Sequence, residues 1–150
     1  MVCASQLVGD HGPHVELTSE GTLRALHPLT LEDVERIAAE AIRNAVNHAK
    51  ASHIWIFLHW GRRELTLAIR DDGVGMPASI LKDGERTGHF GLVGMRERAE
   101  RIGGKLEVAS RERAGTEVTL TLPVHARYRN DRGSLLGFFR DRWNGRRHHE

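Results

Sequence analysis

The sequence predicts an α/β protein, specifically a two-layer α/β sandwich in which helices gather on one face of a mixed sheet. Two observations carry this prediction. Five segments alternate apolar and polar residues as half-buried strands do, and two segments repeat apolar residues every three or four positions as amphipathic helices do. Their order, which is strand, long helix, two strands, long loop, helix and two strands, is typical of helices packed against a sheet.

The composition is that of a single soluble domain. A chain of 150 residues, with 39% hydrophobic and 28% charged residues, can bury roughly 70% of the surface that its unfolded form exposes. No apolar run approaches the ~20 residues of a membrane-spanning helix, and the N-terminus lacks the pattern of a signal peptide. The single cysteine, Cys3, cannot form an internal disulfide. These features predict a cytoplasmic location.

The first two predicted elements are a strand and a long helix. After an irregular start, apolar and polar residues alternate over residues 14–21, and Gly21 ends the segment. A helix then begins at Thr30 or a neighbour and runs to Lys50. Its apolar stripe consists of Val34, Ile37, Ala38, Ala41, Ile42, Ala45, Val46 and Ala49.

Two further pairs of strands complete the predicted sheet. Residues 52–60 and 64–70 are joined by a short link that favours an antiparallel hairpin. A second helix over residues 92–102 ends at two glycines, a common C-terminal signal. Strands over residues 105–110 and 116–123 then close the domain.

Two segments do not fit the sandwich. Residues 71–91 contain five glycines, and so long a loop in a compact domain is usually functional or disordered. Residues 124–150 carry seven arginines against three acidic residues, a net charge of +4, whereas the rest of the chain is at −2. We expect this basic tail to lie outside the sandwich and to be partly flexible. Its mixture of arginine and aromatic residues would also suit a membrane surface or a nucleic acid.

The long helix carries an unusual polar patch. In an ideal α-helix, Glu40, Asn44, Asn47 and His48 fall within about a 100° arc. A solvated helix face is the ordinary explanation for such a patch. Asparagine is a poor helix former, however, and its side-chain oxygen is a suitable Mg²⁺ ligand, while a glutamate one turn away could orient or deprotonate a nucleophile.

A second motif, "DDGVG" at residues 71–75, directly follows a predicted strand. Asp and Gly are ordinary turn residues, so a simple turn is one interpretation. The alternative is a binding role, which depends on the position of the motif at the end of a strand. An acid at the end of a buried strand, Asp71, can accept a hydrogen bond from an exocyclic amine, and Gly73 and Gly75 allow a planar ring to approach the backbone.

Two glycine-containing motifs follow. In residues 88–98, "GHFGLVGMRER", glycines lead into a helix whose free N–H groups could bind phosphates, although an ordinary capped loop fits as well. The sequence contains neither a P-loop nor the dinucleotide-binding fingerprint. The segment "AGTEVTL" at residues 114–120 is by itself a hairpin turn.

The four motifs in this order resemble the nucleotide-binding domain of the GHKL superfamily, which includes sensor histidine kinases, gyrase-type topoisomerases, heat-shock chaperones and mismatch-repair ATPases. "EAIRNAVNHA" resembles the N box, "DDGVG" the G1 box, "GHFGLVG" the G2 box and "GTEV" the final Gly-Thr element. Within the superfamily, "GLVGMRERAERIGGKLEVAS" is similar to histidine kinases that pair with NarL-type response regulators. The segment "VELTSEGTLRALHP" and the basic aromatic tail also resemble the kinases that carry a large periplasmic propeller sensor. The resemblance implies a Bergerat-type ATP-binding fold.

The resemblance also implies roles for individual residues. Asp71 would bind the adenine amino group with support from Thr116, and Asn44 would hold Mg²⁺ that bridges the phosphates. Glu40 would act as a base or orienting group. The other implied nucleotide-binding residues are Asn47, His48, Gly73, Gly75, Gly88, His89, Gly91, Leu92 and Gly94. Asn47 stands where the family commonly has a basic residue, and Asp72 replaces a frequent asparagine.

The resemblance finally implies a domain division and partners. Residues 1–29 would lead from a dimerisation region outside this chain, residues 30–123 would form the ATP-binding domain, and residues 124–150 the tail. No dimerisation hairpin fits the N-terminal segment, so we expect a catalytic domain that cannot autophosphorylate alone. Its partners would be ATP, the phosphoacceptor domain of a membrane-anchored homodimeric parent kinase and, indirectly, a response regulator, with no nucleic acid. The alternatives are an anti-sigma-factor serine kinase, another GHKL ATPase or a non-catalytic ATP sensor.

Overall fold

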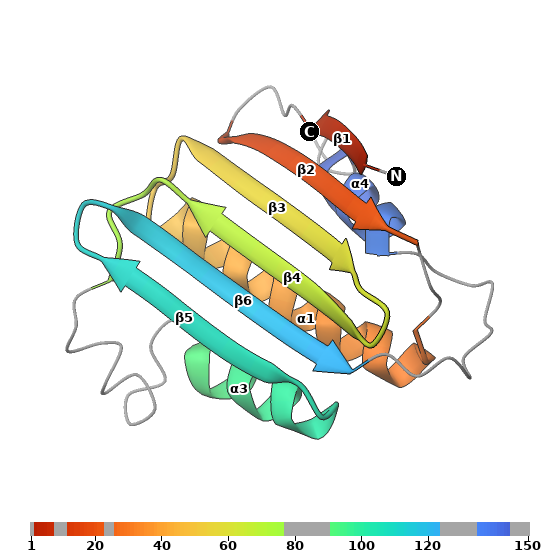
Figure 1. The fold of residues 1–150 in the computed structure, drawn as a ribbon. Helices are drawn as coiled ribbons and strands as arrows, with labels where there is room; N and C mark the ends of the chain where they lie inside the picture. The colour runs from red at the N-terminus through yellow and green to blue at the C-terminus, as the bar shows by residue number, and fades with distance from the viewer. Residues whose placement is uncertain (1, 8–11, 23–25, 77–90, 124–134, 145–150) are drawn as a thin grey trace.

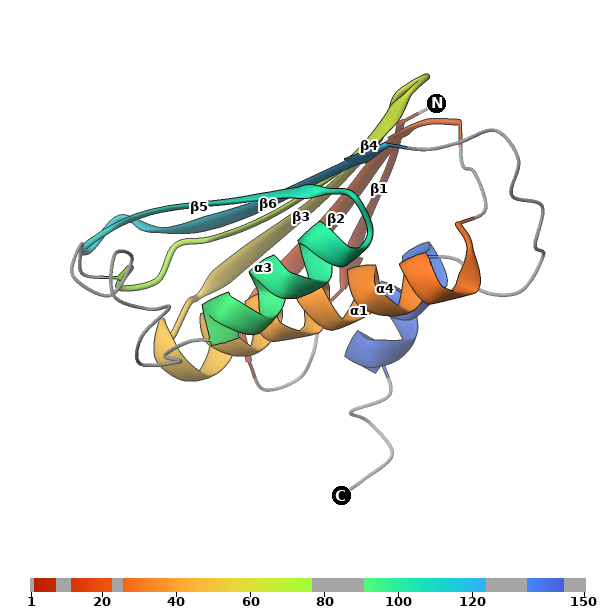
Figure 2. The same ribbon diagram turned by 90° about the horizontal axis from the view of Figure 1, so that it is seen from below.

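The fold is a two-layer α/β sandwich, as the sequence predicts. The computed structural model describes residues 2–7, 12–22, 26–76, 91–123 and 135–144. Within these residues, a six-stranded mixed sheet has one open face, and the helices all lie against the other face (Figures 1 and 2). No helix in the described part of the chain is long and apolar enough to cross a membrane.

The strands follow the order β1-β2-β3-β4-β6-β5 across the sheet. Strands β2 and β3 pair in parallel, and the other neighbouring strands described are antiparallel. The parallel pair follows from the long helix between these two strands, because a crossover is needed to bring the chain back in the same direction. The bounds are β1 Val2–Leu7, β2 His14–Gly21, β3 His53–Trp60, β4 Glu64–Asp71, β5 Lys105–Arg111 and β6 Gly115–Pro123.

The helical elements are α1 Pro28–Arg43, the π-helical turn η1 Asn44–His48, α3 Leu92–Arg101 and α4 Leu135–Asn144. Helix α1 begins with Pro28, and the ring of His27 accepts a hydrogen bond from the Leu29 N–H at 3.2 Å. Proline is well suited to the first turn, where its missing N–H leaves no hydrogen bond unmade. The predicted start of this helix is therefore confirmed to within two residues.

The core lies between the inner face of the sheet and the apolar stripe of α1. Helix α1 contributes a stripe that combines Val34 and Ile37 with the small residues Ala38 and Ala41, all at most 4% exposed. Helix α3 adds Leu92, Met95 and Ala99. The alternate strand residues that face the helices are Val15, Leu17, Ile54, Ile56, Leu58, Leu65, Leu67, Ile69, Val118, Leu120 and Leu122.

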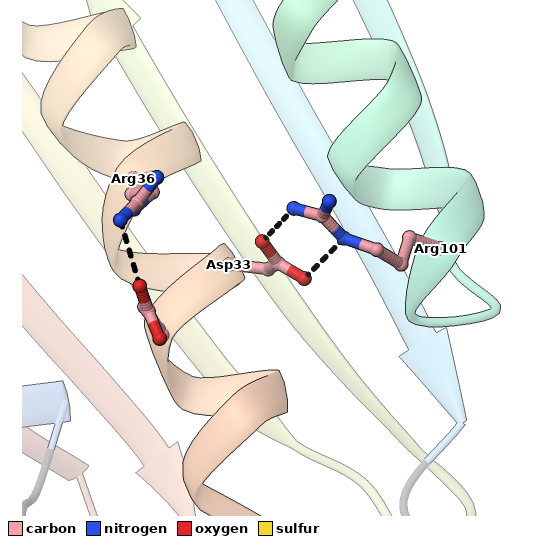
Figure 3. Close-up of polar contacts among 4 residues, drawn as sticks. Asp33, Arg36 and Arg101 are labelled. Carbon is pink, nitrogen blue, oxygen red and sulfur yellow. Dashed lines mark hydrogen bonds and ion pairs between the residues drawn. The ribbon is translucent and has the colours of Figure 1, made fainter.

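An ion pair joins helices α1 and α3. The guanidinium of Arg101 in α3 donates to both carboxylate oxygens of Asp33 in α1, with Nε to Oδ2 at 3.0 Å (Figure 3). Asp33 is 7% exposed, so its charge needs such a partner. Because two N–H groups of Arg101 bind the two oxygens of Asp33, the pair holds α3 at a defined position along α1. The nearby pair of Arg36 with Glu32 lies within α1 and is exposed, so it contributes little.

Two expectations about the chain ends are wrong. Residues 2–7 form strand β1, which pairs antiparallel with β2. The segment has little alternation of its own, and its pairing partner becomes evident only once β2 is placed beside it. Residues 135–144 of the basic tail form α4, which contacts α1 and β1 instead of lying outside the sandwich. Leu135 and Phe139, four positions apart, share one helix face and join the main hydrophobic cluster.

Because one face of α4 belongs to the core, a substitution of a buried residue on that face must cost stability. Phe139 is 2% exposed, and we expect Phe139→Ala to lower the free energy of unfolding by about 3–5 kcal/mol. The matched control is Arg140→Ala on the same helix, an exposed position where we expect a change within about 0.5 kcal/mol. Urea unfolding followed by circular dichroism measures both. Equal stabilities for the two variants would mean that α4 does not pack on the domain.

Candidate functional site

A pocket lies at one end of α1, between η1 and the neighbouring strands β4 and β6. Polar side chains enter it from the helical element and from the ends of the two strands, and apolar side chains line the rest. The lining residues are Ala41, Asn44, His48, Ala49, Ile69, Asp71, Gly75, Met76, Thr116 and Val118. The N-box, G1 and Gly-Thr motifs are far apart in sequence, and the fold places them around this one pocket.

The helical wall of the pocket ends in a π-turn. The sequence predicts one α-helix to Lys50, but the Ala49 N–H donates to the Asn44 carbonyl at 2.9 Å, five residues back. The wider turn sets Asn44 and His48 along the pocket, whereas Asn47 is exposed and is absent from the described lining residues. Asn44 is 6% exposed. π-Turns are rare and frequently occur at functional sites.

The opposite wall carries the carboxylate of Asp71. Asp71 ends β4 and pairs with Thr116 of β6, which lies beside it in the pocket. The side chain is 6% exposed, and its Oδ1 accepts a hydrogen bond from the Gly73 N–H at 2.8 Å. Burial raises the pKa of Asp71, and the nearby Asp72 charge acts in the same direction, while hydrogen bonds from the Gly73 and Thr116 backbones offset part of the rise.

Asp72, the neighbouring carboxylate, serves a different purpose. Its Oδ1 accepts from the backbone N–H groups of Ser52 and His53 at 2.8 and 2.9 Å, and its Oδ2 contacts the His53 ring at 3.1 Å. Although partial desolvation acts to raise it, the contacts with His53 and Ser52 lower the pKa of Asp72 overall. Asp72 therefore ties the G1 segment to the start of β3 and leaves the pocket to Asp71.

Gly75 is a glycine for two independent reasons. Its φ is +73°, in the left-handed region, and a Cβ atom there would lie 1.9 Å from the carbonyl oxygen of Arg111. The Val74 N–H donates to the Ala49 carbonyl at 3.0 Å, and the Arg113 N–H donates to the Val74 carbonyl at 2.6 Å. The G1 segment is thus held between the end of η1 and the turn between β5 and β6.

The start of α3 lies against Glu40. Gly91 has a φ of +64°, in the left-handed region that favours glycine, and a Cβ atom there would lie 2.5 Å from the Glu40 Oε1, so a side chain would be strained and would displace Glu40. The other carboxylate oxygen of Glu40 accepts from Arg43 at 3.1 Å. The positive end of the α3 dipole and a carboxylate are therefore neighbours. Gly94 lies in the first turn of α3. The side chain of Leu92 is buried in the core, so Leu92 can contact a ligand only through its backbone N–H.

The structure brings together many of the predicted site residues. Asn44, His48, Asp71, Gly75 and Thr116 line the pocket. Gly73 lies within the G1 motif, and its N–H donates to the Asp71 carboxylate. Glu40 and Gly91 meet beside the start of α3. Gly88 and His89 lie outside the described residues.

Sequence reasoning missed the lining residues Ile69, Met76 and Val118, and it missed Ser110, which contacts two lining residues. Met76 is 4% exposed and lines the pocket directly after the G1 motif. A methionine in a stretch of glycine and polar residues is the signal that could have identified it, since its thioether suits contact with a ring. Ser110 on β5 hydrogen-bonds to both Met76 and Thr116. Its sequence context, an ordinary strand, carries no such signal.

Comparison with known proteins agrees with this geometry. A family model described as histidine kinase-, DNA gyrase B- and HSP90-like ATPase matches residues 30–126. An uncharacterized sensor-like histidine kinase of Chloroflexus aurantiacus is 43% identical over 89 residues, covering 58% of this chain and 15% of that protein. The sensor histidine kinase YxjM of Bacillus subtilis is 35% identical over 114 residues, covering 75% of this chain and 26% of that protein. The nitrate/nitrite sensor protein NarX of Escherichia coli is 35% identical over 86 residues, covering 57% of this chain and 14% of that protein.

The solved structures agree on the fold. The histidine kinase domain of a blue-light activated histidine kinase from Erythrobacter litoralis matches with a TM-score of 0.58 at 21% identity, covering 73% of this chain and 51% of that one. This chain spans about a quarter or less of the length of the three sequence relatives above. The family match covers more than half of the chain and includes every wall of the pocket. The chain therefore belongs to the histidine kinase-, DNA gyrase B- and HSP90-like ATPase family.

Proposed function

We propose that this chain is the ATP-binding catalytic domain of a two-component sensor histidine kinase. It positions Mg-ATP for phosphoryl transfer to a histidine on a separate dimerisation domain. The observation that carries the proposal is the buried Asp71 carboxylate in a pocket that also contains Asn44, four residues after the Glu40 against which α3 begins. Two of the sequence relatives are named as histidine kinases and the third as a sensor protein, which supports the choice of kinase.

The chemistry of the pocket favours adenine. A carboxylate can only accept hydrogen bonds, and the exocyclic group of adenine is an amine that donates them. Guanine has a carbonyl oxygen at the same position, which Asp71 would repel. Ile69, Met76 and Val118 give the pocket apolar sides suited to the faces of a flat ring.

The phosphates would extend from this pocket toward Glu40 and the start of α3. Free N–H groups at the N-terminus of a helix bind anions, and α3 begins beside Glu40. The buried carboxamide of Asn44 is a hard neutral oxygen donor, which fits Mg²⁺ shared with phosphate oxygens. Bound there, Mg²⁺ would neutralise phosphate charge. In this proposal His48 contacts the nucleotide from within the pocket, and Asn47, which is exposed on the same turn and outside the described pocket lining, contacts only its phosphate end.

The protein's part in the transfer is mainly positioning. Asp71 holds the base, the N–H groups of α3 hold the phosphates, and Glu40 orients or deprotonates the incoming group. The phosphoryl acceptor would be a histidine of the dimerisation domain, so the chain would not autophosphorylate alone. We further propose that the parent protein is a membrane-anchored homodimer, that this domain works in the cytoplasm, and that a response regulator receives the phosphate.

The assignment of Asp71 can be tested by nucleotide binding. We expect Asp71→Asn to weaken ATP binding about 10- to 100-fold, because a charged hydrogen-bond acceptor for the amine is lost. The matched control is Asp72→Asn, which removes the neighbouring charge but keeps an oxygen for the Ser52 and His53 N–H groups. Isothermal titration calorimetry with Mg-ATP measures both. Unchanged affinity in Asp71→Asn would contradict the adenine assignment.

The same substitution should separate stability from function. Because burial raises the pKa of Asp71, its contribution to stability is full below about pH 4 and is lost as pH rises through the raised pKa of the folded state. Without nucleotide, Asp71→Asn should therefore be at least as stable as the native chain at pH 7, and the difference should shrink toward pH 4. Urea unfolding at the two pH values measures this. A variant that is less stable at pH 7 would contradict it.

Phosphoryl transfer distinguishes a kinase from a nucleotide sensor. With Mg-ATP and a separately purified dimerisation domain from a related sensor histidine kinase, we expect acid-labile phosphate on the histidine of that domain. Asn44→Ala should reduce the rate at least tenfold, because it removes the proposed metal ligand, while Asp72→Asn should not. Radiolabelled ATP and gel autoradiography give the measurement. Binding of ATP without transfer would favour the sensor or serine-kinase alternatives.

A further inference from the structure

Ser110 of β5 lies next to the pocket and contacts two of the residues that line it. It is half-buried, and its hydroxyl lies 2.7 Å from the Thr116 hydroxyl and accepts a hydrogen bond from the Met76 N–H at 2.7 Å. Both partners line the pocket. Ser110 itself is absent from the described lining residues, so any effect it has on a ligand must act through these two neighbours.

The hydroxyl of Ser110 has one proton and two competing acceptors. The Met76 N–H occupies one of its lone pairs. Its proton goes either to the Gly115 carbonyl at 3.1 Å or to the Thr116 hydroxyl at 2.7 Å. When the proton goes to Gly115, Thr116 donates to Ser110 and its own proton turns away from the pocket. When Ser110 donates to Thr116, the Thr116 proton can point into the pocket beside Asp71.

The second partner, Met76, directly follows the G1 motif and is the last residue described before residue 77. The Val74 carbonyl accepts a backbone hydrogen bond from Arg113 in the turn between β5 and β6, and Gly75 lies close to the Arg111 carbonyl at the end of β5. The hydrogen bond from Arg113 uses only backbone atoms, so it would survive any substitution there except proline. The contact from Ser110 to the Met76 N–H is made by a side chain, so it can be removed alone.

We propose that Ser110 is a positioning residue for the nucleotide pocket, which orients the Thr116 hydroxyl and holds Met76 against the ring. The proposal rests on the nucleotide-binding function proposed above. A Thr116 proton directed into the pocket can donate to a ring nitrogen, next to an Asp71 carboxylate that accepts from the amine. This pair of groups complements the edge of adenine, and loss of Ser110 leaves the Thr116 hydroxyl free to rotate.

The test is Ser110→Ala, measured as the Kd for Mg-ATP by calorimetry. We expect binding to weaken about tenfold, as the loss of a hydrogen bond that orders two ligand contacts predicts. Ser110→Thr keeps the hydroxyl and should bind within about twofold of the native chain. Thr119→Ala, which removes a half-buried β6 hydroxyl with a long 3.5 Å contact to Glu117 and no contact with the pocket lining among the described hydrogen bonds, is the matched control and should bind as the native chain does.

A double-mutant cycle separates positioning from a merely structural role. If Ser110 acts through Thr116, then Ser110→Ala should weaken binding less in a Thr116→Val background than in the native one. Losses that simply multiply would overturn the proposal. If Ser110→Ala does not fold, Ser110→Cys, which has a similar shape and a weak hydrogen-bonding group, takes its place with the same expectations.

The outcomes also distinguish this proposal from the proposed function. Native affinity in Ser110→Ala, together with weak binding in Asp71→Asn, would overturn the role of Ser110 and leave the nucleotide site intact. Native affinity in Asp71→Asn would contradict the proposed nucleotide site itself, and the role of Ser110 would fall with it. Failure of Ser110→Thr to restore affinity would show that strand packing, not the hydroxyl, is what the pocket requires.

Discussion

The packing of α1 across the sheet is the interaction on which the rest of the structure depends. Its stripe combines Val34 and Ile37 with buried alanines, and small residues allow a helix to approach a sheet closely. This helix returns the chain so that β3 pairs in parallel with β2, and it continues into the π-turn that carries Asn44. The Asp33–Arg101 ion pair then sets the position of α3, whose first residue follows Gly91 beside Glu40.

Burial of the Asp71 carboxylate costs stability, and the same burial serves the proposed function. A carboxylate that is 6% exposed is unfavourable in the empty protein, and its raised pKa reflects that cost. The same desolvation strengthens a hydrogen bond between the carboxylate and a ligand amine, because water does not compete inside the pocket. Asp72, one residue away and exposed, satisfies its charge with the start of β3 and so does not share this property.

The G1 segment shows how a short loop can be set by its surroundings. Gly75 lies where any side chain would meet the Arg111 carbonyl, and backbone hydrogen bonds join Val74 to η1 on one side and to the β5–β6 turn on the other. Ser110 adds a side-chain contact to the same segment and extends it to Thr116. The motifs that resemble boxes in sequence are therefore one connected set of contacts in the structure.

The sequence alone determined the sandwich, because alternation and helical periodicity are local patterns that report which face of each element is buried. It also predicted that Asp71, Asn44 and Gly75 belong to one site, because unusual residue types at strand and helix ends are visible without a structure, and these three residues do line one pocket. Only the tertiary structure decided the rest. The strand β1 and the burial of α4 depend on partners distant in sequence, the π-turn depends on a hydrogen bond between Ala49 and Asn44, and Ser110 becomes a neighbour of Met76 only when β5 is placed beside β6.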